Sequence, residues 1–104
     1  MNKLEKEKMN ETEFTEMLRA EGYEGPEDFA MKPNEVSSRH DHDVDTVLLI
    51  LEGSIVIAKP SGDVTCNVGD TVSYPAGEFH SEKAGPNGVK LVYGWRDPVD
   101  LQNT

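Results

Sequence analysis

The pattern of apolar positions is helical near the start of the chain and changes character at about residue 33. The spacing predicts a short helix over residues 11–21, capped by Asn10 with Glu13 three residues later, which is the capping-box arrangement. Gly22 would end it, since glycine adopts the left-handed conformation common after a helix. The apolar face, at i, i+3 and i+4, consists of Phe14, Met17 and Leu18.

After residue 33 the apolar residues occur in short runs between turn residues, which is typical of strands. The turns are expected at 52–53, 60–63, 68–70 and 85–88. The predicted strands span 35–38, 45–51, 54–59, 64–68, 71–74, 80–83 and 89–95. About seven short strands with frequent turns favour an all-β sandwich or closed barrel over an α/β fold.

A chain of 104 residues is long enough for a single modest core. We expect three parts. Residues 1–32 would form an N-terminal tail, the short helix and a connector over 23–29 that contains the Gly25-Pro26 breaker. Residues 33–96 would form the barrel, and residues 97–104 a polar tail.

The run from Val47 to Leu51 is apolar at every position, so both faces of that strand need cover. One face would line the barrel interior. The other would lie under the N-terminal helix or in an interface with a second copy of the chain. A homodimer is therefore one of two alternatives that the pattern leaves open.

The formal charge of −10, from 10 basic and 20 acidic residues, disfavours binding to nucleic acid and to anionic lipid. The longest apolar run has five residues, whereas a span across a bilayer needs about 20. The first eight residues are mostly charged and no apolar segment follows, so we expect no signal peptide. The only cysteine, Cys66, cannot form an internal disulfide. We therefore expect a cytoplasmic protein that binds a small molecule.

The candidate chemistry lies in the histidines, of which the chain has three. His40 and His42 are two positions apart, which puts both on one face of a strand. His80 follows the turn Pro75-Ala76-Gly77, which can direct the start of a strand. The pattern predicts that all three hold one metal ion. The alternative is that each is an ordinary surface or core histidine.

The segments around these histidines resemble the two motifs of the cupin superfamily. His40, His42 and Gly53 fit the first motif. The second motif is matched position for position by Gly69, Pro75, Gly77 and His80. The resemblance covers about residues 33–95 and extends to small single-domain cupins that are largely uncharacterised. It implies a jelly-roll β-barrel with a divalent transition metal in its mouth, and it leaves Fe, Mn, Ni, Zn and Cu open.

The chain departs from the first motif at Thr46, where the resemblance implies a glutamate ligand. A threonine hydroxyl stays protonated and is a poor ligand, so the site would hold three neutral histidines with more positions open to water or substrate. Glu82 has the parity of His80 and is a candidate fourth ligand or supporting residue. Asp45 is another, although strand alternation would direct it outward.

Three aromatic residues, Tyr74, Phe79 and Tyr93, are candidates for the pocket lining, with core packing as the alternative. Two functions remain open. One is a metal-dependent enzyme, a dioxygenase or isomerase, acting on a small polar molecule. The other is a non-catalytic module or sensor that binds a metal or a small ligand. The fold supports many chemistries and does not choose between them.

Overall fold

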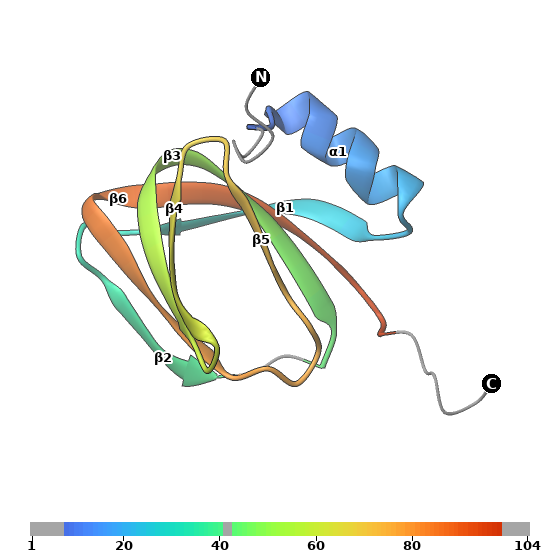
Figure 1. The fold of residues 1–104 in the computed structure, drawn as a ribbon. Coiled ribbons are helices and arrows are strands. Elements are labelled where there is room, and N and C mark those ends of the chain that lie inside the picture. Colours follow the sequence, from blue (N-terminus) through green and yellow to red (C-terminus); the bar gives the residue numbers. More distant parts are fainter. Residues whose placement is uncertain (1–7, 41–42, 99–104) are drawn as a thin grey trace, which may run out of the picture.

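The structure of the chain is a computed structural model that describes residues 8–40 and 43–98, without the side chains of residues 38–40. Strands dominate this part of the chain (Figure 1). The elements are α1 (Glu11–Ala20), β1 (Glu24–Met31), β2 (Val36–His40), β3 (Asp45–Lys59), β4 (Gly62–Asn67), β5 (Thr71–Tyr74) and β6 (His80–Arg96). The fold is all-β with a short N-terminal helix, as the sequence predicts.

The helix forms where the spacing of apolar residues places it. Its N-terminus has the predicted capping box: the Asn10 side chain accepts from the Glu13 amide at 2.8 Å, and the Asn10 amide donates to the Glu13 carboxylate at 3.0 Å. Gly22 follows in the left-handed region, with φ of +80°. The helix is one residue shorter than predicted, because Glu21 is already its C-cap.

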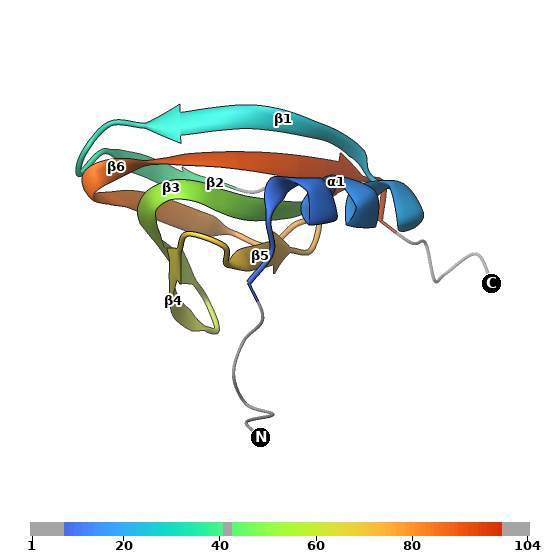
Figure 2. The same cartoon turned by 90° about the horizontal axis from the view of Figure 1, so that it is seen from above.

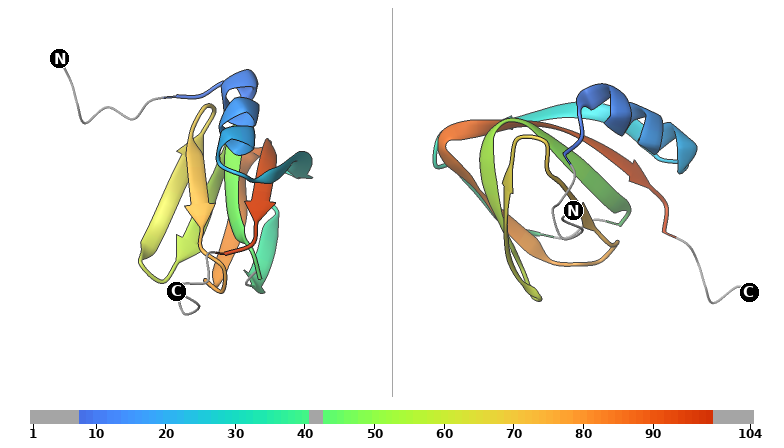
Figure 3. Two further views of the ribbon diagram at one scale, coloured as in Figure 1. Left: turned by 90° about the vertical axis from the view of Figure 1, so that its right-hand side faces the viewer. Right: turned by 45° about the horizontal axis from the view of Figure 1, so that its top comes forward.

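The two long strands β3 and β6 run through the whole fold and pair with each other (Figure 1). The start of β3 and the end of β6 are flanked by β5 and β1, and we call this the first half. The end of β3 and the start of β6 are flanked by β4 and β2, the second half. All these pairs are antiparallel. The curved strands bring the two halves round to face each other (Figure 3).

The predicted turns at 52–53 and 85–88 are wrong, since both segments lie inside continuous strands. They mark instead the places where β3 and β6 bend together. The pairing register of the two strands shifts on either side of Gly53. Gly53 and Gly88 have φ of +77° and +79°, and a Cβ on Gly53 would overlap the Gly88 carbonyl oxygen. Two glycines in close backbone approach permit the bend, and four predicted strands are therefore two. With β1, which was not predicted, the described part has six strands rather than seven.

The predicted connector over 23–29 is also wrong, because β1 occupies Glu24–Met31 and pairs with β6 along its length. Figure 2 shows β1 running beside β6 at the edge of the sheet. Its residues are mostly exposed and do not alternate, so the sequence lacks the period-2 signal of a strand. Residues 24–31 thus extend the sheet that the sequence analysis assigned to 33–96.

The main core lies between the two halves. It consists of Met31, Leu48, Ile50, Ile55, Ile57, Cys66, Tyr74, Ala84, Val89 and Leu91. A second cluster joins α1 to the other face of the first half through Phe14, Leu18, Val47, Leu49 and Val92. The helix is therefore a cover for the second apolar face of 47–51. No helix within residues 8–40 and 43–98 has the length and apolar character needed to cross a bilayer.

Candidate metal and ligand site

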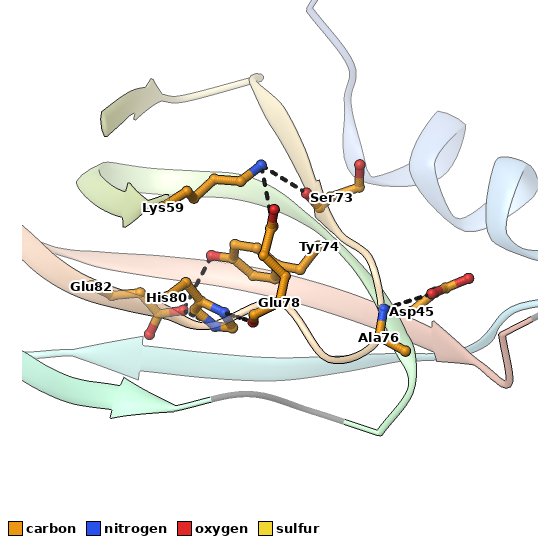
Figure 4. Close-up of polar contacts among 8 residues, drawn as sticks. All are labelled: Asp45, Lys59, Ser73, Tyr74, Ala76, Glu78, His80 and Glu82. Carbon is orange, nitrogen blue, oxygen red and sulfur yellow. Dashed lines mark hydrogen bonds and ion pairs between the residues drawn. The ribbon is translucent and has the colours of Figure 1, made fainter. Parts of the chain in front are cut away.

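The turn before His80 is held in place by Asp45, which stands at the start of β3. The Ala76 amide donates to Asp45 Oδ1 at 2.8 Å (Figure 4). Gly77 has φ of +85°, a conformation that glycine adopts without steric cost. The predicted role of this turn thus has a physical basis, because a carboxylate from another strand fixes its backbone. In this arrangement the Asp45 carboxylate binds the turn.

His80 begins β6 and is buried, with 1% of its surface exposed. Its ring is stacked on Tyr74, with ring centroids 3.8 Å apart and planes inclined by 6°. Its Nδ1 lies 3.2 Å from the Glu78 carbonyl oxygen. A carbonyl can only accept, so Nδ1 carries a proton, and in the neutral imidazole the lone pair is on Nε2.

Glu82 lies two residues further along β6, on the same side as His80. Its Oε2 is 3.5 Å from His80 Nε2 and accepts from the Tyr74 hydroxyl at 3.2 Å (Figure 4). Its Oε1 accepts from the Ser37 hydroxyl at 3.1 Å. Burial raises the pKa of the Tyr74 hydroxyl, and the Glu82 carboxylate raises it further. Tyr74 therefore stays protonated at neutral pH and donates to the carboxylate.

Strand β2 places His40 beside His80, another of the predicted metal ligands. His40 is directly opposite His80 in the pairing of β2 with β6, and Ser37 is opposite Glu82. The register shifts between these two pairs, so β2 has one extra residue there. His42 lies outside the described residues. Among the side chains that the structure describes, no group of three His, Cys, Asp or Glu could hold a metal ion.

A cavity of about 320 Å³ adjoins Glu82 and Tyr74. Its walls are Phe29, Ser37, Val44, Thr46, Leu48, Tyr74, Glu82, Leu91, Tyr93 and Trp95. Thr46 is buried in this wall, with 8% exposure. Tyr93 donates to the Glu27 carboxylate at 3.3 Å, and burial, together with Glu27, raises its pKa. Two polar residues of the lining, Tyr74 and Glu82, are thus next to His80, and apolar residues make up most of the remainder.

Phe79 lies elsewhere. It is 48% exposed and lines a separate hollow of about 200 Å³ with Ala58, Lys59, Pro60 and Ser81. Lys59 in this hollow is bound to the Ser73 carbonyl at 3.4 Å and to the Glu78 carboxylate at 3.6 Å (Figure 4). Of the three aromatic residues proposed for the pocket, Tyr74 and Tyr93 thus share the cavity, whereas Phe79 belongs to another surface.

The fold has close counterparts among solved structures. A cupin superfamily protein from Desulfitobacterium hafniense matches 67% of this chain and 63% of its own, with 26% identity and a TM-score of 0.61. By fold, this chain is a cupin. The matched part is less than two thirds of the Desulfitobacterium protein. An RmlC-like cupin from Shewanella frigidimarina matches 74% of this chain and 68% of its own, with 17% identity and a TM-score of 0.60.

A variant of oxalate decarboxylase from Bacillus subtilis matches 73% of this cupin, with 21% identity and a TM-score of 0.63, although the match covers only 22% of the decarboxylase. At this identity the likeness concerns the fold alone. No protein-family model and no curated protein sequence matches the chain. The three structures therefore establish the jelly-roll architecture of this cupin and leave its activity open.

The sequence analysis did not identify several residues of this site. Ser37 binds Glu82 only because β2 and β6 pair in one register, which no local pattern reveals. Phe29 reaches the cavity from β1, the strand that the sequence analysis treated as a connector. Trp95 carried a signal, since it continues the alternation from Leu91 and Tyr93 along β6, and all three line the cavity.

Proposed function

We propose that this cupin binds a divalent transition metal through His40, His42 and His80 and a small molecule in the adjoining cavity. One observation carries the proposal. The Nδ1 proton of His80 is directed at the Glu78 carbonyl, so the Nε2 lone pair lies 3.5 Å from a Glu82 carboxylate oxygen. Two electron-rich atoms at this distance repel each other unless a cation, either a metal ion or a proton, is close to both.

The surrounding residues fit a metal ligand at Nε2. Histidines that bind metals commonly donate their other ring N–H to a carbonyl or carboxylate, as Nδ1 does here to Glu78. The register that sets His40 opposite His80 supports a shared ion, because opposed positions on neighbouring strands are close together. When bound, the metal would supply Lewis acidity and open coordination positions.

Glu82 is the fourth ligand, directly or through a water molecule, in this proposal. It is the carboxylate beside His80 Nε2, whereas Asp45 is bound to the turn and Thr46 offers only a hydroxyl. A set of imidazoles with one carboxylate suits Fe, Mn, Ni, Zn or Cu. The Mn(II) centres named for Bacillus subtilis oxalate decarboxylase, 21% identical to this chain, support a divalent ion and do not select the metal.

Turnover is the second candidate function, as a dioxygenase or isomerase. The observation that favours it is the cavity, which shares Tyr74 and Glu82 with the surroundings of His80. Oxygen consumption by the metal-loaded protein with candidate substrates would test it. If no substrate increases oxygen consumption with any redox-active metal, the non-catalytic binding module is the better description. A cytoplasmic location and a homodimer are proposed from the sequence alone, but residues 47–51 no longer favour the homodimer, because α1 covers their second apolar face.

The metal content of untagged protein tests the first proposal. We expect about one metal ion per chain in the wild type after incubation with Mn, Fe, Ni, Zn or Cu and gel filtration, and far less in His80→Gln. Tyr93→Phe serves as the control, because Tyr93 lies in the cavity wall and its hydroxyl binds Glu27. Circular dichroism would show that each variant is folded. Equal metal in wild type and His80→Gln would overturn the proposal.

A further inference from the structure

We infer that the cavity beside His80 takes a mostly apolar molecule of one ring or similar size, which carries no negative charge and donates one hydrogen bond to Glu82. The inference rests on the small-ligand part of the proposed function and narrows it. The sequence analysis expected a small polar molecule. The walls of the cavity indicate a less polar ligand, because they have a single polar end and a large apolar surface.

The apolar surface comes from both sides of the cavity. Leu48 and Leu91 are buried core residues that also line it, as does Val44. Phe29, Tyr93 and Trp95 add three aromatic side chains, two of which are in contact, with the Tyr93 and Trp95 ring centroids 5.7 Å apart. Aromatic walls of this kind bind flat or branched apolar groups by burying their surface.

The charges next to the cavity disfavour an anion. None of the described residues that line it is a lysine or arginine, and the one charged group in the lining is the Glu82 carboxylate. Lys59 approaches Tyr74 from another side, with Nζ 5.9 Å from the ring centroid, but it is paired with Glu78. Glu27 adds a second negative charge at the Tyr93 hydroxyl. The walls themselves offer a small carboxylate or phosphate no cationic partner, so an anion would bind only through a metal ion held by His80 and Glu82.

The polar end of the cavity accepts hydrogen bonds. A carboxylate offers about four lone-pair sites. In Glu82, one is used by Ser37, one by Tyr74, and a third faces His80 Nε2. The remaining capacity suits an O–H or N–H donor. A ligand with one such group on an apolar body would satisfy both parts of the lining.

The volume of the cavity limits the size of the ligand. An engineered cavity of about 150 Å³ in another protein holds benzene, so about 320 Å³ has room for a ring with a short substituent. For about eight non-hydrogen atoms, half-saturation near 1 mM is expected.

Three probes of similar shape and different charge test the inference: benzyl alcohol, benzoate and benzylammonium. Trp95 is the only tryptophan of the chain and lines the cavity, so its indole N–H gives a single reporter signal in NMR titrations of the protein as purified. We expect benzyl alcohol to shift this signal saturably and to bind at least tenfold more tightly than benzoate. Benzoate binding as tightly as the alcohol to protein freed of metal with EDTA would overturn the inference, and so would benzylammonium binding more weakly than benzoate.

Two variants tie the signal to the cavity. Glu82→Gln should weaken benzyl alcohol binding several-fold, whereas Glu52→Gln, an exposed glutamate paired with Lys90 on the surface, should leave it unchanged. Val44→Phe should weaken binding strongly by filling part of the cavity that Val44 lines. Ligand-detected saturation transfer repeats each titration without relying on Trp95. Metal content, measured on the same samples, separates the two proposals: normal metal with no benzyl alcohol binding overturns the inference alone.

Discussion

The imidazole of His80 lies flat on the phenol ring of Tyr74, with centroids 3.8 Å apart and planes inclined by 6°. The contact joins the residue that ends β5 to the residue that begins β6, across the turn at 75–77. The Tyr74 hydroxyl also binds Glu82, the carboxylate closest to His80 Nε2. The orientation of His80 is thus set by the protein itself, because the ring is stacked on one neighbour and bonded through Nδ1 to another.

The first prediction concerns the stability of the fold at high pH. The folded-state pKa of Tyr74 is raised above the ordinary value of 10.0, so above about pH 10 the unfolded state releases this proton while the folded state keeps it. Tyr74 should therefore cause no pH dependence of the free energy of unfolding below pH 10. Above pH 10 it should lower that free energy by about 1.4 kcal/mol per pH unit. Urea unfolding between pH 9 and pH 11 measures the slope.

Tyr74→Phe checks the assignment. It keeps the stacked ring and removes the hydroxyl, so it should cost about 1 kcal/mol at neutral pH and flatten the alkaline slope. Tyr23→Phe is the control, because Tyr23 packs under Arg96 on the far side of the fold. An unchanged slope in Tyr74→Phe would show that another group causes the alkaline loss.

The second prediction concerns Asp45, which holds the turn before His80 through the Ala76 amide. Asp45→Ala removes a hydrogen bond to a charged acceptor and should lower the free energy of unfolding by about 2 kcal/mol. Because the turn positions His80, metal affinity should fall by about tenfold as well. Asp43→Ala, at an exposed position two residues earlier, is the matched control and should change neither quantity. Denaturant unfolding and competitive metal titration measure the two effects.

The sequence predicted those features that depend on neighbouring residues. The Asn10 capping box, the turn before His80 and the parity of Glu82 with His80 are all local, and the structure has each of them. Features that depend on strand pairing could not be predicted in this way. Ser37 reaches Glu82 through the register of β2, and Asp45 reaches Ala76 across 31 positions of the chain.

Glycine caused the main errors in the predicted strands. Gly25 with Pro26 suggested a break, yet β1 runs through both. Gly53 and the segment 85–88 suggested reversals, yet the strands continue and bend. A glycine signals that an unusual backbone conformation or a close approach is allowed, and it does not say whether the chain turns back or bends onward.

The third prediction concerns the N-terminal helix. Phe14 is fully buried against the first half of the fold, so Phe14→Ala should cost about 4 kcal/mol of unfolding free energy through the cavity that it leaves. Asn10→Ala should cost about 1 kcal/mol through loss of the cap. Thr12→Ala, at an exposed position of the same helix, should stay within about 0.5 kcal/mol of the wild type. A loss in Phe14→Ala no larger than in Thr12→Ala would mean that the helix does not cover the sheet in solution.

The last prediction concerns the bend at Gly53. An alanine there would have a Cβ that overlaps the Gly88 carbonyl oxygen, and its φ of +77° is unfavourable for any residue with a side chain. Gly22 provides a matched comparison, because its φ of +80° is nearly the same, but no atom lies within 4 Å of an added Cβ. Gly22→Ala should therefore cost only the conformational penalty, about 1–2 kcal/mol, whereas Gly53→Ala should add a steric penalty and exceed it by at least about 2 kcal/mol. Urea unfolding of the two variants measures the difference. Equal losses would mean that β3 and β6 can separate at the bend without cost, and the close approach of Gly53 to Gly88 would then not be what holds the two halves face to face.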